Sequence, residues 1–183
     1  MLTKTKKIIL IIVALLLAVS TATGVTLAYI TAQTPPVENS FTPVFVSCEV
    51  EEDFNQITKS NVKIKNTGDI NAYIRATFVV SWTNDSGNVL SQKPILGTDY
   101  SLVLGSDKWV LGSDGFYYYT LPVEASKSTE ILVSSITMIS TNVPSGYSLS
   151  VYVAATAIQA EPIKTVTSAW NVQIQSNGTL IAP

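Results

Sequence analysis

The stretch KNTGDINAYIRATFVVSW, residues 65–82, joins a turn signal directly to a strand signal. Asn66-Thr67-Gly68-Asp69 favours a tight turn, because glycine reaches backbone conformations closed to other residues and Asn and Asp side chains bond to the nearby main chain. From Ala72 onward, apolar and other side chains alternate, which predicts a strand. One face takes Ile74, Ala76, Phe78, Val80 and Trp82, and the other takes Tyr73, Arg75, Thr77, Val79 and Ser81. The alternation predicts a core-facing side and an outward side that carries Arg75.

The rest of the chain is also typical of a strand-rich protein. Charged residues make up only 13% of the 183 residues, and the abundant Thr, Ser, Val and Ile favour strands. Further strand signals lie at 46–50, 62–65, 116–121, 131–139, 148–157 and 172–174, with one helical turn expected at 166–170. Many short strands with little helical periodicity predict an all-β fold, a two-sheet β-sandwich of jelly-roll or Ig-like type preceded by an N-terminal signal helix.

The N-terminus has the layout of an export signal. Lys4, Lys6 and Lys7 precede an uncharged apolar run at residues 8–19, which are the n-region and h-region of a secretory leader. We therefore expect a signal peptide at 1–28, an extended arm at 29–45, a β-sandwich domain at 46–175 and a flexible tail at 176–183.

The leader has more than one candidate end. Thr26 and Ala28 are small residues suited to a cut between Ala28 and Tyr29, and Ser20 and Ala22 offer an earlier cut. An uncut anchor is the alternative, because residues 8–30 carry no charge and are long enough to span a bilayer. In each case the bulk of the chain lies outside the membrane, which it meets only through the signal segment.

Charge, histidine and cysteine usage exclude several functions. The net charge is −2, and without the three leader lysines it is −5, because 8 Lys and Arg then face 13 Asp and Glu. Such a balance argues against nucleic acid as a partner. The sequence has no histidine and only Cys48 as a cysteine, which excludes Ser-His-Asp and Cys-His pairs, HExxH zinc sites and cysteine zinc clusters. We expect no catalytic, cofactor-binding or metal-binding residues.

Two short segments of alternating charge predict a strand pair. If residues 54–60 turn the chain back, Glu49 lies opposite Lys65 and Glu51 lies opposite Lys63, so that opposite charges meet across the strands. The same alternation turns Cys48 inward beside Val46 and Val50. Its thiol is then expected to be a small buried hydrophobic group.

Aromatic side chains supply the only candidate contact residues. The run FYYYTL at 116–121 is a strand signal, and its tyrosines are suited to core and edge packing. The alternative is a platform for a glycan or a partner surface, for which Trp109, Tyr117 and Tyr119 are the candidate partner-contact residues.

Six segments taken in order carry a resemblance to a known family. They are VTLAY at 25–29, PPVENSFTP at 35–43, VSCEVEEDF at 46–54, KNTGDINAYIRA at 65–76, DGFYYYTLPV at 114–123 and AIQAEPIKTVTSAW at 157–170. Together they cover nearly the whole chain. The sequence resembles the exported proteins that depend on the SipW-type signal peptidase, the group that includes the biofilm-matrix fibre protein TasA and camelysin.

The resemblance implies export from a Gram-positive-type bacterium, cleavage by that peptidase near residues 27–29 and a jelly-roll-like fold. It also implies self-association, in which the N-terminal arm of one subunit completes a sheet of the next. A matrix or anchor protein is a further expected partner. Pro35, Pro36 and Pro43 each remove a main-chain donor, so a long continuous donor strand is not what this arm favours.

Three functions follow from these observations. The first is a secreted, non-catalytic structural protein of the cell surface or extracellular matrix. The second is a secreted adhesion module. The third is a camelysin-like metallopeptidase, against which the lack of histidine and of paired ligand spacing argues.

Overall fold

The computed structural model describes residues 4, 6, 45–55 and 57–183. The expected leader, its cut between Ala28 and Tyr29 and nearly all of the arm at 29–45 lie outside these residues. Chain contacts divide the protein into Met1–Thr42 and Pro43–Pro183; Lys4 and Lys6 of the first unit are helical. In the described part of the chain, no helix is both long and apolar enough to cross a membrane.

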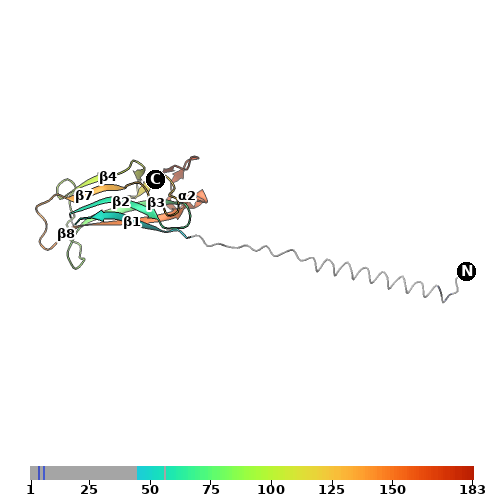
Figure 1. The fold of residues 1–183 in the computed structure, drawn as a ribbon, viewed down its shortest axis with the longest axis horizontal. Helices are drawn as coiled ribbons and strands as arrows, with labels where there is room; N and C mark the ends of the chain where they lie inside the picture. Colours follow the sequence, from blue (N-terminus) through green and yellow to red (C-terminus); the bar gives the residue numbers. More distant parts are fainter. Residues whose placement is uncertain (1–3, 5, 7–44, 56) are drawn as a thin grey trace. The chain divides into compact units, whose positions relative to one another are not determined.

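The second unit is built from two antiparallel sheets of four strands each (Figure 1). The first sheet has the order β1 (Cys48–Phe54), β2 (Thr58–Asn66), β7 (Val133–Met138), β4 (Tyr100–Leu104). The second has the order β5 (Trp109–Leu111), β6 (Tyr117–Tyr119), β3 (Ala72–Thr83), β8 (Ser148–Gln159). The helix α2 (Ile163–Trp170) and a hairpin of β9 (Gln173–Ile174) and β10 (Leu180–Ile181) complete the unit. The all-β prediction is confirmed.

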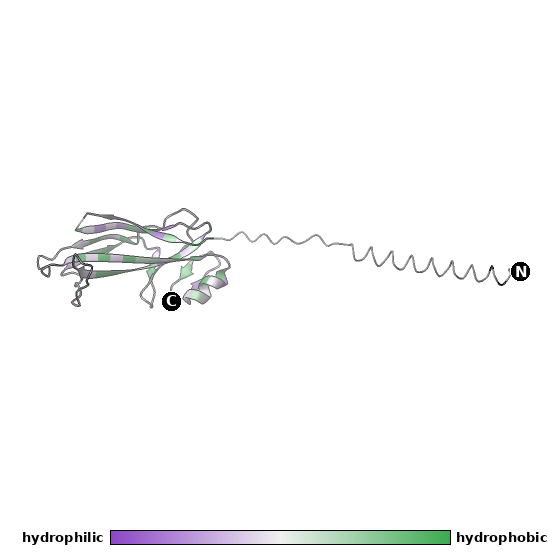
Figure 2. Cartoon of the chain, turned by 90° about the horizontal axis from the view of Figure 1, so that it is seen from below, coloured by the Kyte–Doolittle hydropathy of each residue, from purple (hydrophilic) through white to green (hydrophobic). Residues whose placement is uncertain are grey.

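Side chains from both sheets share the main core. Val62 and Ile64 of β2 and Ile74 and Ala76 of β3 are all fully buried in it. Along the strands, hydrophobic and hydrophilic residues alternate in colour in Figure 2, as expected for strands with one face in a core. The core-facing set predicted for 72–82 is confirmed, because Phe78 and Val80 pack against this cluster and Trp82 is buried.

The predicted turn at Asn66–Asp69 anchors the start of the described domain. The amide of Thr67 donates to the carbonyl of Ser47, and the amide of Asp69 donates to the carbonyl of Phe45. Position 68 requires glycine because the main chain passes close to it. A Cβ atom at Gly68 would lie 2.5 Å from the carbonyl oxygen of Phe45. The turn therefore fixes where the chain enters β1.

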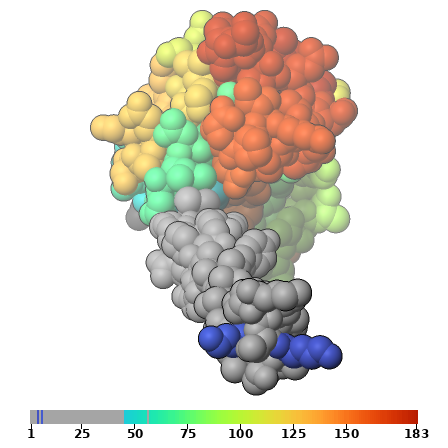
Figure 3. Space-filling model, turned by 90° about the vertical axis from the view of Figure 1, so that its right-hand side faces the viewer, coloured from blue at the N-terminus to red at the C-terminus, as the bar shows by residue number. Residues whose placement is uncertain are grey.

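The outward face of β3 is not exposed along its whole length. α2 and the C-terminal hairpin cover one end of the sheet and form a second core with Tyr73 and Tyr118, which are 2% and 0% exposed. Figure 3 shows α2 and the C-terminal segment, in orange to red, lying together at one end of the domain. The alternation put Tyr73 on the outward face, and its side chain does lie there, but a later segment folds over that face and buries it.

The tail expected to be flexible at 176–183 is part of the fold. Leu180 is 1% exposed and its amide donates to the carbonyl of Thr120 at 2.8 Å. The Tyr73 hydroxyl donates to the carbonyl of Gly178 at 2.7 Å, and the amide of Ser113 donates to the carbonyl of Pro183. The domain boundary predicted at residue 175 is therefore wrong, because these last residues complete the second core.

Candidate interaction edge

β8 is an unpaired edge of the second sheet. On one side all twelve of its residues pair with β3, from Ser148 opposite Thr83 to Gln159 opposite Ala72. Among residues 45–55 and 57–183, no strand pairs with the other side. An edge strand of an antiparallel sheet directs alternate main-chain N–H and C=O groups away from its neighbour, where they are available to a further strand.

The sequence of β8, SLSVYVAATAIQ, contains no charge and no proline. Proteins normally protect an edge strand with charged residues, proline, a bulge or short length. β1 has such protection, since it carries Glu49, Glu51, Glu52 and Asp53 and its register shifts between Glu51 and Asp53. The edge strands β4 and β5 have only five and three residues. β8 is therefore the long edge without these protections.

The core lies open where β8 passes beside β1. Val151, Val153, Ala155 and Ala157 of β8 pack against the main core but are only partly buried, as are Cys48 and Val50 of β1. At one end of this seam is a cavity of about 420 Å³ whose lining includes Phe54, Leu149 and Val151. A strand added at β8 would extend the sheet and cover these half-exposed side chains.

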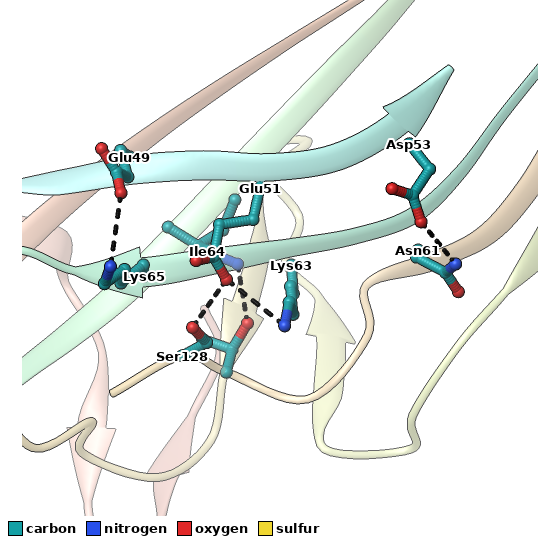
Figure 4. A network of polar contacts seen from close by, with 9 residues as sticks. Glu49, Glu51, Asp53, Asn61, Lys63, Ile64, Lys65 and Ser128 are labelled. Atoms are coloured by element: carbon teal, nitrogen blue, oxygen red, sulfur yellow. Dashed lines mark hydrogen bonds and ion pairs between the residues drawn. The ribbon is translucent and has the colours of Figure 1, made fainter. Parts of the chain in front are cut away.

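The predicted charge pairs lie on the face of β1 opposite to Cys48 and Val50. Glu49 pairs with Lys65 and Glu51 pairs with Lys63 in the register of β1 and β2, with N–O distances of 3.7 and 3.4 Å (Figure 4). This prediction is confirmed. A hydrogen bond from Ser128, together with the hydrogen bond and charge of Lys63, lowers the pKa of Glu51, so Glu51 is ionised at neutral pH.

Cys48 contributes its side chain to the same seam. It packs against the main core and is partly buried. Burial raises the pKa of its thiol, so the thiol stays protonated at neutral pH and is a poor nucleophile.

The three candidate contact aromatics lie in the core. Trp109 and Tyr119 are 8% and 7% exposed, and their ring centroids are 5.2 Å apart. Tyr117 is stacked on Phe78 with centroids 5.5 Å apart. The exposed aromatic rings of the described residues include those of Phe45, Phe54 and Tyr152, which are 60%, 63% and 72% exposed. Strand alternation puts Tyr152 of β8 on the outward face of its sheet, but no feature of the sequence distinguished it from its neighbours.

Arg75 joins β3 to the segments that cover it. Its guanidinium carbon lies 4.3 Å from the ring centre of Phe116 and 4.9 Å from that of Trp170. Nη1 donates to the hydroxyl of Tyr118 at 3.2 Å and lies 3.7 Å from Oδ2 of Asp114. Arg75 therefore meets both a carboxylate and aromatic faces, and these contacts give it a structural role.

Asp114 should make the stability of this cluster depend on pH. Partial desolvation opposes its ionisation, but hydrogen bonds from the Tyr118 hydroxyl and the Phe116 amide and the charge of Arg75 outweigh that effect and lower the pKa of Asp114. A pKa lowered by folding gives stability that is present above the unfolded value of about 3.9 and is lost as the pH falls through the folded value.

We therefore expect the stability advantage of the natural protein over Asp114→Asn to shrink as the pH falls below about 4. Urea unfolding of both proteins at neutral and acidic pH measures this difference. An advantage of the same size at both pH values would show that the charge of Asp114 is not the stabilising feature.

The described residues offer no catalytic metal centre. Within them, no group of three or more Cys, Asp or Glu side chains is placed to hold a metal ion. The chemistry that the site supports is main-chain and apolar contact with another polypeptide. Comparisons with known families, with curated proteins and with solved structures find no match for this chain.

Proposed function

We propose that this chain is an exported, non-catalytic structural protein of the cell surface or extracellular matrix that polymerises by adding a strand of one subunit to β8 of the next. The observation that carries the proposal is the long uncharged edge of β8 beside a half-covered core. Such an edge is a template for another strand, and a monomer that left it open would be prone to association.

The strand order favours a β-sandwich of jelly-roll type over the Ig-like alternative. β2 pairs with β7 in one sheet, and β3 pairs with β6 in the other. These pairs are nested in the sequence, and the chain passes from β4 in one sheet to β5 in the other between them. Two nested pairs in opposite sheets are the arrangement of a rolled double hairpin.

The donor strand in this proposal is YITAQT, residues 29–34. It is uncharged and contains the strand-favouring residues Tyr29, Ile30 and Thr31, which suits an uncharged edge. Pro35 and Pro36 end the donor strand because proline supplies no main-chain N–H. Residues 35–45 then form a connection that spans about 36 Å when extended, since each residue adds about 3.3 Å.

The proposal includes a SipW-type signal peptidase as the processing partner and a location outside the cell. Catalysis is left out because the sequence has no histidine and one cysteine. Adhesion through Trp109, Tyr117 and Tyr119 is also left out, because these rings pack in the core. Self-association needs none of these groups.

Electron microscopy of two purified chains tests the proposal. We expect the chain that begins at Tyr29 to form filaments and the chain that begins at Pro35 to stay monomeric, because only the first carries a donor strand. A peptide of residues 29–36 should bind the shorter chain and raise its melting temperature, since a ligand that binds only the folded state stabilises it.

The matched control is the same peptide with Ile30→Pro, which lacks a main-chain donor in the middle of the strand. It should leave the melting temperature unchanged. Filaments of equal length and number from both chains would overturn strand donation by residues 29–34.

A further inference from the structure

The second sheet has a bare, uncharged outer face at the end that α2 does not cover. Its cross-strand pairs are Thr83 with Ser148, Ser81 with Ser150, Val79 with Tyr152 and Thr77 with Ala154. We call these eight residues the lateral face. None carries a charge, and Val79 and Tyr152 are 58% and 72% exposed.

Tyr152 is the one large residue of the lateral face. Along β8 its neighbours on this face are Ser150 and Ala154, and Val79 is opposite it on β3. The ring of Tyr152 therefore projects above the smaller side chains around it. A second lateral face turned through a two-fold rotation would place each ring over the small residues of the other, which is a self-complementary contact.

Charge favours a second copy of this chain as the occupant. The chain from Tyr29 has a net charge of −5, from 8 Lys and Arg against 13 Asp and Glu, so identical copies repel each other in most orientations. The lateral face brings no like charges together, and a strongly charged partner would find no opposite charge there.

The size of the lateral face decides when the contact forms. Seven residues of two strands cover about 23 Å by about 10 Å, on the order of 250 Å². A stable dimer needs about 800 Å² from each partner, so single subunits do not pair through this face. A filament repeats the lateral face once per subunit. Many weak contacts between two filaments then add up, because the subunits of each filament are linked.

We propose that the lateral face joins filaments side by side into bundles by packing against the same face of a second copy. The inference rests on the proposed function, since it needs filaments. A donor strand at β8 would widen the face by a further uncharged strand, because residues 29–34 carry no charge. The lateral contact is therefore continuous with the proposed strand-addition interface.

The test compares filaments of the chain from Tyr29 with those of Val79→Lys, which changes the lateral face on β3 and leaves the edge strand β8 unaltered, and with those of Val103→Lys. Val103 lies on β4 and is 53% exposed, so the second variant adds the same charge at a similar apolar surface position outside the lateral face. We expect single filaments of normal length from Val79→Lys and bundles from the other two, by electron microscopy and low-speed sedimentation. Thermal unfolding of both variants checks that each is folded.

Each result decides the inference. Bundles of Val79→Lys filaments that match those of the natural chain would overturn the lateral contact while leaving strand donation intact. Loss of bundling in Val103→Lys as well would show that added charge, rather than this face, is responsible. Absence of filaments from the natural chain would overturn the proposed function and the lateral contact with it.

Discussion

Replacing Asn66 with alanine is expected to lower the free energy of unfolding by about 3–5 kcal/mol, because each buried polar group left without a partner costs about 1–3 kcal/mol. The Asn66 side chain is fully buried. Its Nδ2 donates to the carbonyls of Ile70 and Val123 at 2.8 and 2.9 Å, and its Oδ1 accepts from the amide of Gly68 at 3.0 Å. Alanine satisfies none of these three groups. Urea unfolding measures the loss.

Two further variants make the result specific. Asn142 is exposed, so Asn142→Ala should change stability by less than about 0.5 kcal/mol. Asn66→Asp keeps an acceptor for Gly68 but loses the donor to two carbonyls; it should be strongly destabilised at neutral pH and partly recover when acid protonates the carboxylate. An Asn66→Ala protein as stable as Asn142→Ala would contradict the role given to this side chain.

Replacing Arg75 with alanine is expected to lower the free energy of unfolding by about 2–4 kcal/mol, from lost stacking on two rings and lost hydrogen bonds of a charged group. Arg75 lies between the rings of Phe116 and Trp170 and donates to Tyr118 and Thr156. Trp170 lies at the end of α2, which covers the sheet. The loss of stability should therefore be largest in α2 and the segments beside it. Hydrogen exchange of the α2 amides should accelerate more than that of the β2 amides.

Arg75→Lys is the matched variant, because it keeps the charge but lacks the planar guanidinium that stacks and bonds in several directions. It should recover only part of the lost stability. If Arg75→Ala accelerates exchange equally in α2 and β2, the residue does not specifically hold the C-terminal segments to the sheet.

Predictions from the sequence succeeded where the cause is local. The alternation from Ile74 to Trp82 follows from the two-residue period of a strand, and the turn at Asn66–Asp69 follows from side chains that bond to their own main chain. The pairing of Glu49 with Lys65 was also predictable, because a short hairpin brings nearby segments of opposite charge together. These features depend on few residues close in sequence.

Predictions failed where the cause is distant. The alternation put Tyr73 on the outward face without showing that this face is covered, and the last residues were expected to be flexible. In the structure α2 and the β9–β10 hairpin, about a hundred residues further along the chain, fold over that face, and the Tyr73 hydroxyl donates to the carbonyl of Gly178. For the tyrosines at 116–121, core packing was the first interpretation, and Tyr117 and Tyr119 do pack in or against the core. The alternative, a binding role for Trp109, Tyr117 and Tyr119, rested on exposure, which alternation alone does not give for short strands. Burial of a side chain depends on what packs over it.

The sequence by itself determined the strand-rich composition, the main turns, the core-facing residues of the long strands and the lack of histidine chemistry. Only the tertiary structure decided that β8 is the unpaired edge, that its inner residues are half covered and that one half of its outer face is bare. The physical reason is that side-chain alternation and turn formation depend on residues close in the sequence. Whether a strand is at the edge of a sheet depends instead on whether any other strand pairs with its second side. That property belongs to the arrangement of all the strands together.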